Sequence, residues 1–420
     1  MSFHIKKFGL NLGVSTPSKT QEDVEKLLLK PISNSQPAQM RNIEFGASQD
    51  LIDIYDIKSN LNLAKTKLDS IYNADPTKAS KIMSAFDPFN RIKYEIAKIS
   101  NAHNITNAWL KAYELICRYK LIPGKAENFR YFDNAAFPGS FILAVNHYVN
   151  TLTDIKHFEW KASSLLPSGA TTSEYLGDTY NLYRNYPENW FMNDMFNGDI
   201  TNTNYLHYII RKLGQNAENH FDLYSCDLGI DVSDNYNEQE KSHFKLNLCQ
   251  VIFGIFTIKK GGSMVIKHYT IFEPYTLSYI SLLTGLFENF YIDKPITSKR
   301  TNSEIYLICN KFIGFNMETY NIIKLLVERM HSNDFSPLIS SDYILPQIHD
   351  IRNAMDSIYT GQIKALQHFI NIANNFNKPY NICYKTLLPI NEDLRNKFKE
   401  HVLIPKIRSE LNLNQKICYN

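Results

Sequence analysis

The sequence lacks the cysteine patterns that hold metals. Its 420 residues contain six widely spaced cysteines, with no CxxC motif and no Cys/His pair at zinc spacing. Several of them lie in apolar runs, as in Leu248-Cys249 and Leu307-Ile308-Cys309, where a free cysteine behaves as a small hydrophobe. We therefore expect reduced, buried thiols in a reducing compartment and no metal site.

Long apolar runs and a strong net charge are also missing. No stretch reaches the about 18 apolar residues that suggest a membrane-spanning helix, and the N-terminal MSFHIKKFGLNLG has no long apolar segment. The formal net charge is only +3, which gives no footprint for bulk, nonspecific nucleic-acid binding. We expect a cytoplasmic protein without a membrane partner, in which any nucleic-acid contact comes from a local patch.

The pattern of the chain changes twice along its length. Residues 1–100 begin with a polar Ser/Pro-rich arm and continue with helical periodicity at 50–72 and 87–99. Residues 101–320 alternate helical and strand-like runs, which is typical of a parallel sheet covered by helices. Residues 321–420 show mostly helical periodicity, at 317–330 and 345–376. No internal repeat and no low-complexity tract interrupts these three regions.

The middle region predicts most elements of an α/β fold. Within this region, the stretch from Trp160 to Phe196 is less regular and rich in aromatic residues. The predicted strands are a run ending near Asp133, FDLYSCDL, SMVIKHY, NFYID and SEIYLIC. The predicted helices are AWLKAYELICRY, a segment after Gly139, TNYLHYIIRKLGQ, SHFKLNLCQVIFGIF and YTLSYISLLTGLF.

Polar residues at the strand ends are the candidates for chemistry, because ligands of open α/β sheets bind beyond the carboxyl ends of the strands. Asp133, Asp227 and Lys267 end three predicted strands, and Glu304 begins a fourth. Burial behind Met264-Val265-Ile266 would lower the pKa of Lys267 and favour a neutral amine that acts as a general base. The alternative is a structural ion pair, because such pairs also perturb pKa values.

A turn between strand and helix, YFDNAAFPGSFILAVNHY at 131–148, raises the question of a cofactor. Turns of this kind in nucleotide-binding crevices usually contain several glycines, because the backbone must approach the ligand closely. Only Gly139 is present here. No GxGxxG follows a strand, which argues against an NAD-dependent oxidoreductase.

Seven ordered blocks within 105–315 resemble the FtsJ-like, Adrift-type S-adenosylmethionine-dependent ribose 2′-O-methyltransferases. The chain is most similar to members that act on the second nucleotide of the mRNA cap and to relatives in large cytoplasmic DNA viruses. The blocks are AWLKAYEL, AFPGSFILAVNHY, FNGDIT, FDLYSCDLG, NEQEKSHFKLNLCQ, IKKGGSMVIKHYTIFEP and KPITSKRTNSEIYLIC. The resemblance implies a Rossmann-like sandwich with a mostly parallel seven-stranded sheet at 101–320, flanked by helical regions at 1–100 and 321–420. For a viral protein it further implies a viral factory or virion.

The resemblance also implies a catalytic set of Lys111, Asp227, Lys267 and Glu304, in which Lys267 is the base or orients the hydroxyl. Lys111 follows from the resemblance alone; by its pattern it is a solvated helix lysine. Asp199 matches the carboxylate that accepts from the adenine amino group of S-adenosylmethionine, and its sequence context alone indicates an ordinary turn before a helix.

The turn that would pass beneath the methionine end of S-adenosylmethionine departs from the family pattern. Pro138, Gly139 and Phe141 are retained. Ala136 stands where close relatives have glutamate, Phe137 where they have alanine, and Ser140 where they have glycine or alanine. Phe137 either points into the sheet, where it does no harm, or crowds the methionine moiety.

Capped mRNA is the implied partner, and three cations just before Glu304 are the predicted RNA contacts: Lys294, Lys299 and Arg300. Lys259 and Lys260 are predicted to be a solvated connection at the opposite end of the sheet. One alternative function is a catalytically silent RNA- or cap-binding module with a degraded cofactor site. Another is a scaffold whose terminal helices recruit other capping or transcription proteins.

Overall fold

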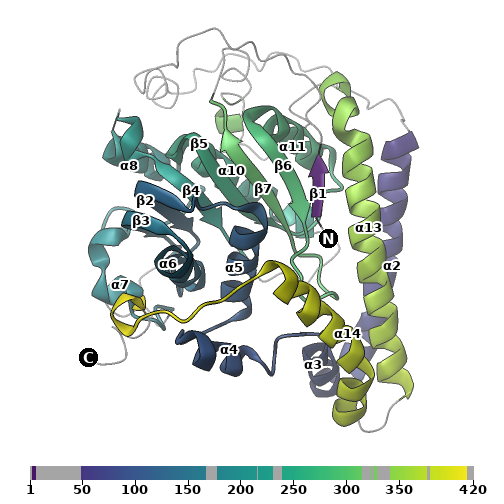
Figure 1. The fold of residues 1–420 in the computed structure, drawn as a ribbon. Coiled ribbons are helices and arrows are strands. Elements are labelled where there is room, and N and C mark those ends of the chain that lie inside the picture. Colours follow the sequence, from purple (N-terminus) through teal and green to yellow (C-terminus); the bar gives the residue numbers. More distant parts are fainter. Residues whose placement is uncertain are drawn as a thin grey trace.

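The sheet at the centre of the molecule has seven strands in the order β1-β6-β7-β5-β4-β2-β3 (Figure 1). The computed structural model describes residues 2–5, 49–166, 177–214, 216–229, 239–314, 323, 326–328, 341–375 and 379–413. The strands are β1 Ser2–Ile5, β2 Lys125–Asn134, β3 Asp154–Ser163, β4 Phe221–Cys226, β5 Ile258–His268, β6 Phe287–Asp293 and β7 Ile305–Phe312.

The sheet is mixed, with a parallel half and an antiparallel half. Strands β3, β2, β4 and β5 are neighbours and run parallel. Strand β7 runs antiparallel between β5 and β6, and β1 pairs antiparallel with β6. In the β5–β7 register, His268 lies opposite Ile305. The beginning of β7 therefore lies at the same edge as the ends of β2, β4 and β5.

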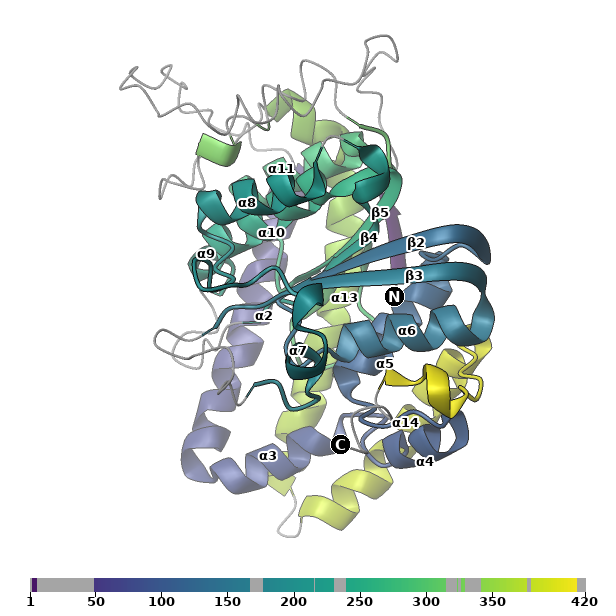
Figure 2. The same ribbon diagram turned by 90° about the vertical axis from the view of Figure 1, so that its left-hand side faces the viewer.

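Helices cover both faces of the sheet because its central strands carry buried, mostly apolar side chains on both faces. On one face, Tyr131, Leu223 and Val265 pack against α5 (Asn107–Tyr119) and α6 (Ser140–Leu152). The other face packs against α8 (Thr203–Leu213), α10 (Phe244–Thr257) and α11 (Pro274–Leu286), as Figure 2 shows edge-on. The predicted sandwich is thus confirmed.

Helices from the two ends of the chain pack together beside this sandwich. Helix α2 (Gln49–Ala74) lies along α13 (Ser341–Asn375) in both views, and α3 (Pro76–Ala85) lies near α14 (Pro379–His401) (Figures 1 and 2). They share a separate apolar core whose members include Ile82, Phe86, Phe369 and Leu387. The remaining short helices are α4 Lys93–Ser100, α7 Leu182–Asn185 and α9 Gln239–Ser242, with 3-10 turns at Pro187–Asn189, Ala217–Asn219 and Ser409–Leu411.

The predicted helices of the middle region and the long ones at 50–72 and 345–376 are confirmed. Strand β3, which ends within the stretch beginning at Trp160, was missed because it is an edge strand with mostly exposed or half-exposed residues and no clear alternation. Most of the helix expected at 317–330, except residues 323 and 326–328, and most of the Ser/Pro-rich arm lie outside the described residues. No described helix is long and apolar enough to cross a membrane.

Replacing Phe369 tests the packing of the terminal helices. Its ring is fully buried against Tyr72 and Phe86, so Phe369→Ala should lower the free energy of unfolding by about 3–5 kcal/mol. Chemical denaturation followed by circular dichroism measures this. The control is Tyr94→Ala, at a side chain that is 79% exposed, with an expected change within about 0.5 kcal/mol. Equal small effects of both variants would contradict the described core.

Candidate active site

Four charged side chains meet at the carboxyl edge of the sheet. Lys111 comes from α5, Asp227 follows β4, Lys267 lies near the end of β5, and Glu304 directly precedes β7. The antiparallel direction of β7 explains why a residue at the beginning of a strand joins residues at the ends of others. The structure thus brings together the four residues that the resemblance implied.

The four side chains form two adjacent lysine–carboxylate pairs. The Lys111 ammonium donates to both carboxylate oxygens of Glu304, at 3.0 Å to Oε1 and 2.9 Å to Oε2. Lys267 Nζ lies 3.1 Å from Asp227 Oδ1 and donates to the Asp227 carbonyl oxygen at 2.9 Å. All four side chains are largely buried, between 8% and 18% exposed, so the pairs are held with little competition from water.

Two hydroxyl groups that the sequence did not single out hold the carboxylates in place. Tyr306 donates from its hydroxyl to Asp227 Oδ1 at 2.7 Å, and Ser298 donates to Glu304 Oε1 at 2.6 Å. Both residues lie in one of the seven blocks, KPITSKRTNSEIYLIC. Membership of this block is the sequence feature by which they could have been identified.

The carboxylates decide the charge state of the lysines. Burial alone would lower the pKa of Lys267, but Asp227 and Glu304, with Tyr269, outweigh burial and raise it above its usual value. The pKa of Lys111 is likewise raised, because Glu304 and Asp227 outweigh burial and the repulsion by Lys267. Burial would raise the pKa of Glu304, yet the two lysines lower it to about 2. The prediction of a lysine made neutral by burial is therefore wrong for the free protein, in which both lysines are charged.

The turn after β2 has an unusual backbone. Ala135 has a φ of 56°, the Phe137-Pro138 peptide is cis, and Gly139 has a φ of 110°. A Cβ at Gly139 would lie 2.2 Å from Cδ1 of Leu182, so this position needs glycine for both conformation and space. Gly139 therefore lies where the backbone needs glycine, and Ala135 takes the other left-handed position of this turn.

Phe137 is accommodated by neighbouring aromatic side chains. Its ring stacks on Trp190, with centroids 4.6 Å apart, and meets Tyr183 edge-on at 6.2 Å. The side chain is half-buried in the apolar cluster on the α5/α6 face. The ring thus packs against the segment around α7.

Ser164, just beyond β3, connects this turn to the loop that contains Asp199. Its hydroxyl accepts from the Phe137 backbone N–H at 3.3 Å. Gly198 has a φ of 85°, and a Cβ there would lie 2.0 Å from the Ser164 carbonyl oxygen. Asp199 Oδ1 accepts from the backbone N–H and the hydroxyl of Thr201, both at 2.8 Å. The structure therefore places the two segments predicted to bind the cofactor side by side.

Ser140 and Phe141 begin helix α6 directly after the turn. The Ser140 hydroxyl lies 2.9 Å from Thr106 Oγ1 at the start of α5. Phe141 stacks on Tyr306, with ring centroids 6.5 Å apart. Ser140 thus ties the turn to α5, which carries Lys111, and Phe141 ties it to Tyr306 of β7, whose hydroxyl donates to Asp227.

Asp133 lies beneath the turn, at the end of β2, with 1% of its surface exposed. Its Oδ1 accepts from the Ser225 hydroxyl at 2.6 Å, whereas Oδ2 has no hydrogen-bond partner among the described residues. Burial raises the pKa of this carboxyl group to about 8. A buried carboxyl oxygen without a partner, aligned with the ends of β3 and β4, marks this edge as the place of a polar ligand.

Within the described part of the chain, no group of three His, Cys, Asp or Glu side chains could hold a metal ion.

The predicted RNA contacts behave differently from one another. Lys294 donates to the carbonyl and side-chain oxygens of Asn302, both at 2.8 Å, and to the Glu304 carbonyl oxygen at 2.9 Å. Its three donors hold the loop, so a contact with an RNA phosphate does not fit its geometry. The side chains of Lys299 and Arg300 are half-buried and have no hydrogen bond or ion pair to any described residue.

Lys259 and Lys260 lie in the first half of β5, at the end of that strand away from the site. Lys259 pairs with Asp222 at 2.9 Å, and Lys260 is exposed. Their predicted position at the opposite edge of the sheet agrees with this geometry, but the prediction of a solvated connection is wrong, because both residues belong to a strand and Lys259 is paired.

Comparison with known proteins gives the family. The model of the FtsJ-like methyltransferases matches residues 105–312, within the range of the seven blocks. The chain is 33% identical over 334 residues to "Probable methyltransferase EP424R" of African swine fever virus (isolate Warthog/Namibia/Wart80/1980), covering 74% of this chain and 76% of that protein. It is 27% identical over 276 residues to "Cap-specific mRNA (nucleoside-2'-O-)-methyltransferase 2" of Drosophila melanogaster, covering 65% of this chain and 38% of that one. The likeness to a protein of a large DNA virus and to cap-modifying enzymes, expected from the blocks, is thus confirmed, and the chain belongs to the FtsJ-like methyltransferase family.

Proposed function

We propose that this protein transfers a methyl group from S-adenosylmethionine to a ribose 2′-hydroxyl at the 5′ cap end of mRNA. The observation on which this rests is the pair of buried lysine–carboxylate contacts at the carboxyl edge of the sheet. The names of the Drosophila relative and of a mouse relative, 30% identical over 279 residues, support capped mRNA as the substrate class. Because the chain spans little more than a third of those two proteins, their substrate is a proposal for this one.

The residues around the 135–140 turn are suited to hold S-adenosylmethionine. When bound, this group supplies the electrophilic methyl. Asp199 would accept from the adenine amino group, and the backbone of the turn at Ala136, Pro138 and Gly139 would lie against the methionine end. The free Oδ2 of Asp133, aligned with the same edge, gives the site a further acceptor or, when protonated, a donor.

Lys267 has the position of the group that handles the hydroxyl proton. In an in-line transfer the neutral amine of Lys267 would take the proton of the 2′-hydroxyl while the hydroxyl oxygen receives the methyl group that S-adenosylmethionine would supply. Asp227 fixes the direction of the Lys267 side chain and is itself fixed by Tyr306. Lys111 neutralises Glu304, so that both carboxylates of the set of four are paired with a lysine.

A catalytically silent RNA- or cap-binding module is the second candidate. The observation that favours it is the altered turn, with Ala136, Phe137 and Ser140 at positions where relatives differ. The stacking of Phe137 on Trp190 and the intact set of four charged residues favour the enzyme.

Replacing Asp199 tests the cofactor site. Asp199→Ala should weaken binding of S-adenosylmethionine and S-adenosylhomocysteine by about tenfold or more, because a hydrogen bond to a charged acceptor is lost. Isothermal titration calorimetry measures both ligands. Asp194→Ala, an exposed acid a few residues earlier, is the matched control and should bind as the unmodified protein does. A protein that binds capped RNA but neither ligand would support the silent module and contradict the enzyme.

Replacing Lys267 tests the chemical step. Lys267→Met keeps the length of the side chain but removes its ammonium group, so the single-turnover rate of methyl transfer should fall by about 10²–10⁴-fold. Binding of S-adenosylhomocysteine should change little. The control is Lys260→Met, at an exposed position on the same strand but at its other end. Retained activity in Lys267→Met would show that this residue handles no proton in the reaction.

The raised pKa of Lys267 predicts a pH dependence. Because Asp227 and Glu304 stabilise the charged form, only a small fraction of the lysine is a neutral base near pH 7, and this fraction grows about tenfold per pH unit below its pKa. The single-turnover rate should therefore rise steadily as the pH is increased through the neutral and mildly alkaline range. Rates measured with capped RNA and saturating S-adenosylmethionine test this, and a flat profile would limit Lys267 to orienting the hydroxyl.

A further inference from the structure

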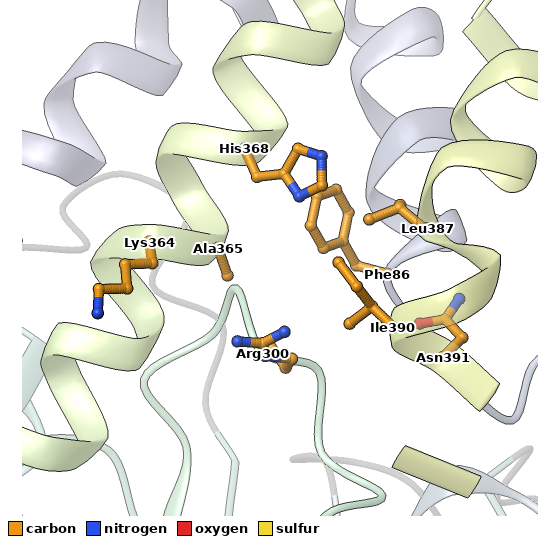
Figure 3. Close-up of a pocket in the computed structure, with 8 residues that line it drawn as sticks. All are labelled: Phe86, Arg300, Lys364, Ala365, His368, Leu387, Ile390 and Asn391. Carbon is orange, nitrogen blue, oxygen red and sulfur yellow. The ribbon is translucent and has the colours of Figure 1, made fainter. Parts of the chain in front are cut away.

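A cavity of about 150 Å³ lies where the 294–304 loop meets the terminal helices (Figure 3). Its lining combines residues from α13 and α14 with residues of the loop and of the segment after α3. They are Phe86, Arg300, Lys364, Ala365, His368, Leu387, Ile390 and Asn391. The family match ends at residue 312, so most of this lining comes from outside the methyltransferase core.

The cavity combines an apolar wall with positive charge. Phe86, Leu387 and Ile390 form one side, and the imidazole of His368 meets the Phe86 ring edge-on at 6.0 Å. Arg300 and Lys364 are cations, and none of the eight lining residues is acidic. Within the described residues, neither cation has a hydrogen bond or ion pair, so both are available to an anion.

A buried polar atom also faces the cavity. Asn391 is 3% exposed, and its side-chain N–H donates to the Ala85 carbonyl oxygen at 3.0 Å. This bond fixes the amide, and Figure 3 shows its oxygen turned inward, towards Ile390. An amide oxygen in this position can accept from the amino group of a base.

We propose that this cavity binds a nucleotide of the RNA substrate, with its base against Phe86 and Ile390 and its phosphate between Arg300 and Lys364. A cavity of about this volume holds a benzene-sized ring, so it suits one base. The two cations would repel the positively charged methylated guanine of a cap, so the occupant is a neutral base with its phosphate. The proposal rests on the proposed function, because the RNA that it places in the cavity is the substrate of the catalytic site.

The loop places this cavity next to the catalytic centre. Arg300 precedes Glu304 by four residues, so their Cα atoms lie within about 15 Å, a distance that a short run of linked nucleotides spans. Gln362 of α13 donates to the Thr301 carbonyl oxygen and to the Ser303 hydroxyl, both at 3.0 Å. One end of an RNA strand could therefore be held by the terminal helices while its reacting ribose lies at Lys267.

Charge reversal at Lys364 tests the proposal. Lys364 is exposed, so Lys364→Glu should fold normally, and it should weaken the binding of a short fluorescent capped RNA by about tenfold, measured by anisotropy. Lys399→Glu on α14 makes the same change in net charge outside the cavity and should bind nearly as the unmodified protein does. Equal losses in both variants would reduce the effect to general electrostatics and overturn the proposal.

The salt dependence and a free nucleotide give two further readouts. Lys364→Ala should reduce the magnitude of the slope of log affinity against log salt concentration by about 0.7, which is the contribution of one phosphate contact with a single strand. Lys399→Ala should leave this slope unchanged. The contrary result would be that free guanosine monophosphate binds as tightly as RNA, and that Lys364→Glu abolishes this binding without affecting the binding of RNA. This result would assign the cavity to a free nucleotide and overturn the RNA assignment. The rate of methyl transfer distinguishes the failure of this proposal from the failure of the proposed function. If Lys364→Glu transfers methyl groups and binds RNA normally, only the cavity proposal is rejected. If RNA binding depends on Lys364 but the unmodified protein transfers no methyl group, only the proposed enzyme function is rejected.

Discussion

The two lysine–carboxylate pairs at the carboxyl edge of the sheet are the constraint on which the rest of the site depends. Charges in such a dry position are tolerated only when each has a partner, because burial of a lone ammonium or carboxylate costs several kcal/mol. The pairing of Lys111 with Glu304 and of Lys267 with Asp227 meets this condition and keeps both lysines charged. The same contacts orient the ammonium groups toward the edge where a ligand of this fold binds.

The antiparallel strand β7 and the loop before it link this centre to the remainder of the chain. The reversed direction of β7 brings Glu304 to the edge formed by the ends of β4 and β5. The 294–304 loop is held by Lys294 from within and by Gln362 of α13 from outside. The terminal helices therefore do more than add stability, because they fix one end of the segment that supplies a charged member of the site.

Much of the fold could be predicted from sequence, since apolar periodicity marks the helices and the buried strands. Strand β3 was missed because an edge strand buries few of its residues, and β1 because four residues of a polar arm carry no periodic signal. Asp227, Lys267 and Glu304 could be chosen from strand ends, but Lys111 lies within a helix and needed the family resemblance. The charge state of Lys267 could not be predicted, because it is decided by distances between residues far apart in sequence. The prediction of Lys294 as an RNA contact failed for the same reason, because the oxygen atoms that accept from its ammonium group are brought to it by the shape of the loop.

The most direct test of the central claim is mass spectrometry of capped RNA after incubation with the protein and S-adenosylmethionine, followed by nuclease digestion. The account predicts one added methyl group on the ribose of a nucleotide next to the cap, and no addition when that ribose lacks its 2′-hydroxyl. A methyl group found on a base or on the cap guanine, or equal methylation of the RNA that lacks the hydroxyl, would contradict it. So would the absence of any methylation by a protein that binds both the RNA and the cofactor.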